Sequence, residues 1–220
     1  MIRHCIRGSA LLLAGAALAS CADIGSPLRS GNQSYEFRQV VAVGDTLSFH
    51  WPESAMPITF WAEDTVGLPE HADSAIAVWQ RQFLYHEFTG SRVADSATAD
   101  VIIRYGPPPN DAVLIPALVD ACQAATDMRL DAVTRTLALP MHVYIAARFL
   151  PDDPGTQDCF RIVMIHELGH VLGILRHSND PLDIMYGNPT AAEPTTRDRN
   201  TVQVMYHWPV NVTLTGGGAP

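Results

Sequence analysis

The chain contains no lysine, and its positive charge comes entirely from arginine. The 14 arginines are outnumbered by 23 acidic residues, so the formal net charge is −9 at pH 7. Proteins that bind DNA or RNA need clustered basic residues for phosphate contacts, and no such stripe is present. We therefore expect no nucleic-acid partner and attribute the acidity to a solvated surface.

Long apolar runs are also missing. The one conspicuous run, residues 10–19, is too short for a transmembrane helix. It follows Arg3 and Arg7 and ends in small residues, which is typical of an export signal. We expect residues 1–20 to be a signal peptide that is removed.

The end of this signal resembles the bacterial lipoprotein box, at Leu18-Ala19-Ser20-Cys21. The resemblance implies that Cys21 is lipidated and that residues 21–34, rich in Gly, Ser, Pro and Asn, form a flexible tether. Ala22 stands where the usual inner-membrane retention signal is aspartate, so we expect a lipid-anchored protein of the cell envelope, at the outer membrane. The alternative is an ordinary secretory signal with a cysteine just after the cut.

Cysteine is scarce, with four residues in the whole chain. Once the signal is removed and Cys21 carries lipid, Cys122 and Cys159 remain as an even pair in an oxidising compartment. A disulfide between them would fix the chain just ahead of residues 162–172. Two buried free thiols are the alternative.

A helical segment with two histidines dominates the C-terminal half, His166-Glu167-Leu168-Gly169-His170. Residues four apart lie on one helix face, so His166 and His170 can direct both imidazoles at one metal ion. Glu167 lies beside that ion and can accept a proton from metal-bound water. The same segment has an apolar stripe for the core, formed by Ile162, Val163, Ile165, Leu168, Val171 and Leu172.

Gly173 follows where the helix has to end, because glycine adopts left-handed dihedrals without a Cβ clash. The turn back brings His177 round as a third nitrogen ligand. Three protein ligands leave the fourth position of a catalytic zinc ion open.

These residues resemble the metzincin clan of zinc metallopeptidases, most closely its matrixin-like members, whose pattern is H-E-x-x-H-x-x-G-x-x-H followed by a methionine turn. The matching positions are His166, Glu167, His170 and Gly173. The chain departs from the pattern at the third histidine, where Arg176 stands. A guanidinium has no lone pair for a metal, so we expect a turn one residue longer, with His177 as the ligand.

The resemblance implies one catalytic Zn²⁺ and a methionine turn at Asp183-Ile184-Met185-Tyr186, with Met185 as an apolar floor under the metal. Met185 as ordinary core filling is the alternative. Matrixin-like enzymes often bind Ca²⁺ as well, but the chain has no D-x-D-x-D-G loop to support it. No cysteine lies in residues 22–56, so we expect no cysteine-switch propeptide there. The enzyme is either made active or controlled in some other way.

The order of elements predicts an α+β fold. The resemblance implies a metzincin-like catalytic domain: a twisted mixed sheet with an N-terminal helix, a zinc-binding active-site helix and a C-terminal helix. We expect one domain over 35–209, most similar to the clan over 57–209, and a disordered tail over 210–220. The expected elements are a strand pair within 35–50, strands at 57–61, 100–105 and 141–145, and helices at 73–88 and 196–206. Residues 110–130 give no clear pattern, and His142 is expected to be structural.

The function that follows is a zinc-dependent endopeptidase with protein or peptide substrates and Glu167 as general base. Such domains usually bind substrate as an extra strand on an exposed sheet edge, which residues 123–130 are expected to supply. Two alternatives remain: a zinc amidase acting on cell-wall peptides, and a catalytically silent zinc-binding lipoprotein or adhesion module.

Overall fold

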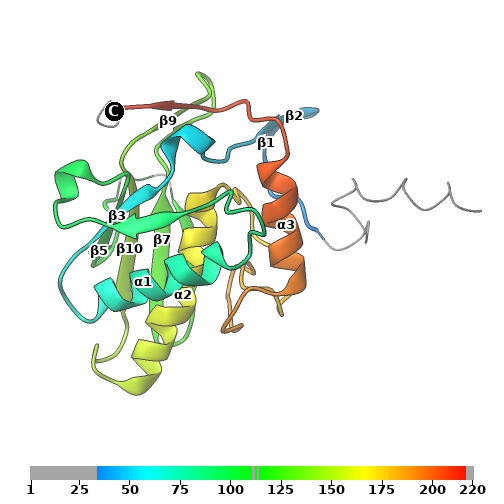
Figure 1. The fold of residues 1–220 in the computed structure, drawn as a ribbon. Coiled ribbons are helices and arrows are strands. Elements are labelled where there is room, and N and C mark those ends of the chain that lie inside the picture. Colours follow the sequence, from blue (N-terminus) through cyan, green and yellow to red (C-terminus); the bar gives the residue numbers. More distant parts are fainter. Residues whose placement is uncertain (1–33, 111, 113, 217–220) are drawn as a thin grey trace, which may run out of the picture. The chain divides into compact units, whose positions relative to one another are not determined.

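The computed structural model describes residues 34–110, 112 and 114–216. The predicted α+β class is confirmed, with a six-stranded mixed sheet and two helices, α1 and α2, packed against it and against each other (Figure 1). Strands β4, β3, β5 and β10 run parallel, and β7 and β6 continue the sheet antiparallel. In sheet order the strands are β4 (Gly90–Arg92), β3 (Ile58–Ala62), β5 (Val101–Tyr105), β10 (Met141–Ala147), β7 (Cys122–Asp127) and β6 (Ile115–Leu118).

The sheet and the helices share one apolar core. Strand β3 alternates buried and half-buried side chains along its length, as does most of β10, which is the pattern of a strand with one face on the core. Helix α1 (Leu68–Gln80) is fastened to α2 (Pro154–Leu172) by the buried Trp79, whose indole N–H donates to the Ile165 carbonyl at 2.7 Å. The core thus fixes the helix that carries the histidine motif.

The N-terminal helix was predicted at 73–88 but spans Leu68–Gln80. Apolar spacing through Phe83 and Leu84 extended the predicted helix. In the structure both lie in the loop after α1, where Leu84 is exposed and the Phe83 ring is buried with its centroid 6.0 Å from that of Phe88. Gly90, the predicted helix end, begins β4 instead, and its N–H donates to the Gln80 side chain at 2.8 Å.

Two smaller sheets complete the chain. The strand pair predicted within 35–50 is the antiparallel hairpin β1 (Gln39–Ala42) and β2 (Asp45–Leu47). The third sheet contains β8 (Leu130–Asp131), β9 (Thr136–Ala138) and β11 (Thr213–Thr215). The prediction of a disordered tail is therefore wrong at Thr213–Thr215, which pairs in parallel with β9 because β9 leaves an edge free for backbone hydrogen bonds. Residues 217–220 lie outside the described part.

The C-terminal helix α3 (Thr196–Tyr206) has the predicted bounds, and Val202 and Met205 lie in the core. Short 3₁₀ turns occur at Glu53–Ala55 and Ser96–Thr98. Within the described residues, no helix has both the length and the apolar character needed to cross a bilayer.

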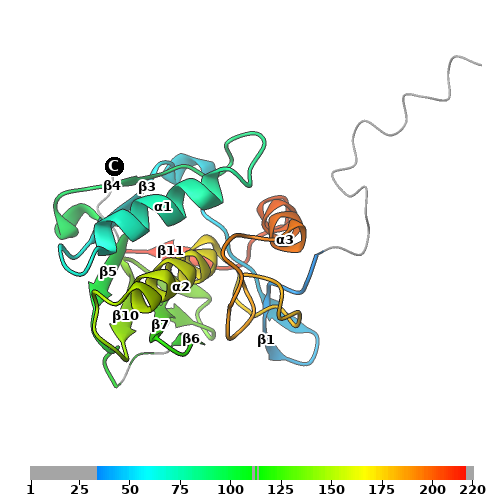
Figure 2. The same ribbon diagram turned by 90° about the horizontal axis from the view of Figure 1, so that it is seen from below.

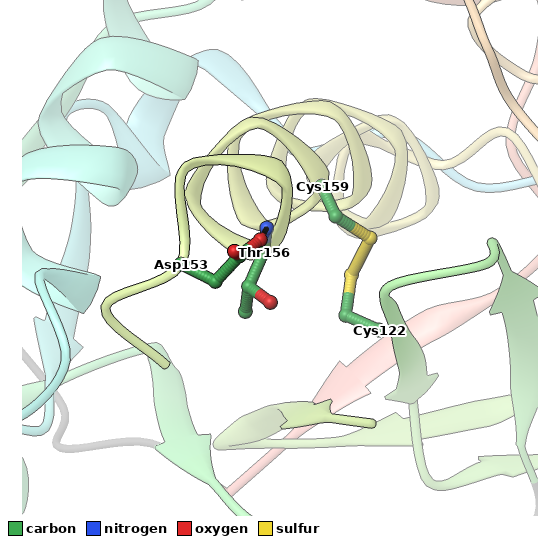
Figure 3. The surroundings of a disulfide bond; sticks show 4 residues. All are labelled: Cys122, Asp153, Thr156 and Cys159. Carbon is green, nitrogen blue, oxygen red and sulfur yellow. Dashed lines mark hydrogen bonds between the residues drawn. A yellow bond between two sulfur atoms is a disulfide. The ribbon is translucent and has the colours of Figure 1, made fainter. Parts of the chain in front are cut away.

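The Cys122–Cys159 disulfide is present and joins the start of β7 to the first half of α2 (Figure 3). Near it, the Asp153 side chain caps the helix, accepting the backbone N–H groups of Gly155 at 2.9 Å and Thr156 at 3.3 Å. Strand β7 and the active-site helix are therefore fixed to one another covalently.

Candidate metal centre

The last turns of α2 hold His166, Glu167 and His170, all three fully buried. The helix ends at Gly173, whose φ of +120° only glycine adopts readily. A Cβ atom there would lie 2.1 Å from the carbonyl oxygen of Phe49. The absence of a side chain therefore lets the chain turn under the segment that leads out of β2.

The structure brings the three predicted ligands together. The ring centroids of His166 and His170 are 4.8 Å apart, and that of His177 lies 5.1 Å from each. The Nδ1 atom of His166 donates to the Ile184 carbonyl at 2.7 Å, and that of His170 donates to the Ile174 carbonyl at 2.5 Å. A carbonyl can only accept, so Nδ1 carries the proton and Nε2 keeps its lone pair for a metal.

The arrangement of these lone pairs fits one zinc ion. The Nε2 atoms of His166 and His170 face each other at 3.1 Å, and Nε2 of His177 is buried with no hydrogen-bond partner among the described residues. One potential ligand atom from each histidine lies within 4.8 Å of the others. Tetrahedral zinc with nitrogen ligands at about 2.0–2.1 Å places them about 3.4 Å apart, close to the spacing already present.

Burial keeps these imidazoles uncharged. It lowers the pKa of His166 to about 3, lowers that of His170 well below its ordinary value, and lowers that of His177. Neutral imidazoles are the form that binds a metal. The site is thus in the ligating form at neutral pH.

The longer turn after α2 gives Arg176 and His177 different surroundings. Arg176 is exposed, whereas His177 is half-buried against the other two histidines. Ser178 closes the loop: its N–H donates to the Met185 carbonyl at 2.7 Å and its hydroxyl donates to the Asp183 carboxylate. The one extra residue is accommodated in solvent, and the histidine still reaches the site.

Met185 is fully buried directly under the active-site helix. A Cβ atom on Gly169 would lie 2.3 Å from its sulfur and 2.9 Å from the Trp79 ring. Gly169 stands between the two histidines on α2, so Met185 packs under the site and also belongs to the core. Met185 therefore fills the core and lies under the metal site at the same time.

Sequence reasoning missed Asp198, which organises the methionine turn. Its carboxylate accepts the backbone N–H groups of Ile184 at 3.0 Å and Met185 at 3.4 Å. The Ile184 carbonyl in turn accepts from His166, so Asp198 acts on a histidine through one peptide unit. The available signal was the pattern Thr195-x-x-Asp198, which forms the capping box of α3.

Replacing Asp198 with alanine is expected to lower the free energy of unfolding by about 3 kcal/mol, because buried backbone donors lose their acceptor. Tyr35→Phe is the matched control, since it removes only the 2.8 Å bond from the Tyr35 hydroxyl to the same carboxylate and should cost about 1 kcal/mol. Denaturant titration of the metal-free protein measures both. Equal losses would show that the methionine-turn bonds contribute nothing.

Thr126 on β7 was also missed, because residues 110–130 gave no pattern. Its hydroxyl donates to Oε2 of Glu167 at 2.6 Å. Burial raises the pKa of the Glu167 carboxyl to about 8, while the Thr126 hydroxyl and the nearby backbone amide of Ala117 lower it. A bound cation would lower it further.

His142, which was expected to be structural, lies on β10 with its ring stacked on that of Tyr144 and is not part of the histidine cluster.

Comparison with known proteins agrees with this geometry. The matrixin (peptidase M10) family model matches residues 62–207, which include the active-site helix, the methionine turn and α3. Macrophage metalloelastase of Rattus norvegicus is 45% identical over 65 residues, which is 27% of this chain and 14% of that protein. The chain therefore corresponds to a small part of the length of this curated relative.

Proposed function

The chain belongs to the matrixin family, and on that premise we propose that it is a zinc-dependent endopeptidase with Glu167 as general base. The proposal rests on one observation: a buried cluster of three histidines with an intact carboxylate beside it. Zinc binding alone does not require Glu167, whereas hydrolysis of a peptide bond does. This favours an enzyme over a silent metal-binding module.

Each residue has a separate task in this reaction. His166, His170 and His177 would hold a zinc ion, which would supply Lewis-acid chemistry for activating water near neutral pH. Thr126 holds Oε2 of Glu167, and Oε1 has no hydrogen-bond partner among the described residues. Oε1 is thus available to take the proton from water and to pass it on to the leaving amine.

The test is proteolysis by a soluble version beginning at Asp23, offered unfolded protein and mixed peptides. We expect cleavage that a chelator abolishes and added zinc restores, with one zinc bound per chain. A folded, zinc-loaded chain that cleaves none of these substrates would contradict the endopeptidase. It would favour the binding module or, if cell-wall peptides are hydrolysed, the amidase.

Replacing His177 with alanine is expected to weaken zinc binding by more than about 100-fold, since loss of an outer partner alone costs 10–100-fold. Its exposed neighbour supplies the control, because Arg176→Ala should leave zinc affinity unchanged. Competition with a chromogenic chelator measures both variants. Equal affinities for the two would mean that the longer turn does not deliver the third ligand.

We further propose that the protein acts at the cell envelope, anchored through lipid on Cys21. This residue and the signal peptide lie outside the described residues, so the support is the lipoprotein-like sequence alone. Cys21→Ser should move the protein from the membrane fraction to the soluble fraction. Persistence of the variant in the membrane fraction would contradict the anchor.

A further inference from the structure

Residues 123–130 were expected to supply the exposed edge of the main sheet, but the strand at that end is β6. Strand β7 is an inner strand, paired with β10 on one side and with β6 on the other. Strand β6 lies at the end of the sheet and packs against α2 (Figure 2). The strand that carries Thr126 therefore has both of its edges occupied.

Segment 114–121 contains β6, and its middle lies beside the active-site residue Glu167. At one end, Leu114 and Ile115 line an apolar cavity of about 340 Å³ that also includes Thr126 and Leu175. In the middle, the Ala117 amide lies near the Glu167 carboxylate, and neither residue has exposed surface.

At its other end the segment lies beside the first half of α2. Val119, Asp120 and Ala121 line a cavity of about 260 Å³ together with Ile162 of α2 and residues 188–190 after the methionine turn. The segment thus runs along the outer edge of β7, with Glu167 opposite its middle.

A peptide that binds to this sheet as an added strand needs a free strand edge near Glu167. Strand β7 is beside that carboxylate, because Thr126 contacts it, and the edge of β7 nearest to it is the one paired with β6, whose Ala117 amide also lies near Glu167. We propose that segment 114–121 is a built-in blocking strand, which occupies the position of the substrate and holds cleavage by the wild type at least 10-fold below the rate of the uncovered site. This inference rests on the proposed endopeptidase function.

Strand β6 is suited to leaving. It has only four residues, so few backbone hydrogen bonds hold it, and the Leu118 side chain is already 46% exposed. Strand β7 begins at Cys122, which the disulfide fixes to α2. Release of β6 would therefore uncover a β7 edge that stays in place. A removable strand also supplies the control of activity that the absence of cysteine in residues 22–56 leaves open.

A double variant tests the proposal, Ile115→Glu with Val119→Glu. Both side chains are only partly buried and pack on the core, and a charge at each should loosen the strand without touching the zinc ligands or Glu167. We expect kcat/KM for an unstructured peptide to rise at least 10-fold. The control, Leu118→Glu, places the same charge on the exposed side chain of the same strand and should stay within twofold of the wild type.

A synthetic peptide of residues 114–121 should inhibit the double variant competitively, because it replaces the displaced strand. Equal cleavage rates in the wild type and the folded double variant would overturn the blocking role.

Access to the metal is measured separately with a fluorescent hydroxamate peptide, which binds zinc without being cleaved. On zinc-loaded protein we expect at least 10-fold tighter binding to the double variant than to the wild type. Tighter binding without cleavage by any chain would support the blocking strand and contradict the endopeptidase. Equal binding to the two folded chains would overturn the blocking strand, whatever the proteolysis shows.

The wild type gives a check that does not depend on folding of the variants. Saturation with the hydroxamate peptide should speed hydrogen exchange at residues 114–118 and leave β7 as protected as before, because the peptide takes the place of β6. Unchanged exchange in β6, with the probe bound, would overturn the proposal.

Discussion

Glu167→Gln is expected to lower kcat/KM for peptide cleavage by about 10²–10⁴-fold while zinc stays bound, which is the range for loss of a general base. Glutamine has the shape of glutamate, and its amide oxygen can still accept from Thr126. It cannot take a proton from water. The measurement is kcat/KM at matched zinc content, on the wild type and on the Ile115→Glu, Val119→Glu double variant.

Thr126→Val separates the base from its positioning. Valine keeps the volume but removes the 2.6 Å hydrogen bond to Oε2, so we expect a loss of about 10-fold, the equivalent of one hydrogen bond to a charged group. A Glu167→Gln chain that keeps more than a tenth of the activity would assign proton transfer to another group.

The part of the site that sequence could predict is encoded at short range. His166, Glu167 and His170 lie within one helical turn or so, and the geometry of that helix places them whatever surrounds it. Gly173 and His177 follow within the same loop. The turn requires a glycine and the metal requires a ligand atom with a lone pair, and residue type alone shows both. For this reason Arg176, whose guanidinium has no lone pair for a metal, could be excluded as the ligand.

The parts that sequence missed depend on contacts between distant segments. Thr126 lies 41 residues from Glu167, and Asp198 lies 14 from Ile184 across a loop. Strand β7 reads Cys-Gln-Ala-Ala-Thr-Asp, whose small side chains give no alternation although three in a row are buried. The predicted helix at 73–88 failed for the opposite reason, since Phe83 and Leu84 continue helical spacing although they lie in a loop.

Gly173→Ala is expected to lower the free energy of unfolding by more than about 4 kcal/mol, or to prevent folding, because two costs combine there. The first is the positive φ, about 1–3 kcal/mol for a residue with a Cβ atom. The second is the overlap with the Phe49 carbonyl at 2.1 Å. That oxygen belongs to the backbone of a buried residue and cannot swing aside as a flexible side chain would.

Gly106→Ala isolates the first cost. Gly106 has φ +123°, close to the +120° of Gly173, but its added Cβ atom would meet nothing within 4 Å. We expect this control to lose only about 1–3 kcal/mol in a denaturant titration and to keep its zinc. Similar losses of unfolding free energy in the two variants would show that the Phe49 backbone moves to make room for the added Cβ atom. A Gly173→Ala chain that folds but binds zinc weakly would show that the close approach serves to deliver His177.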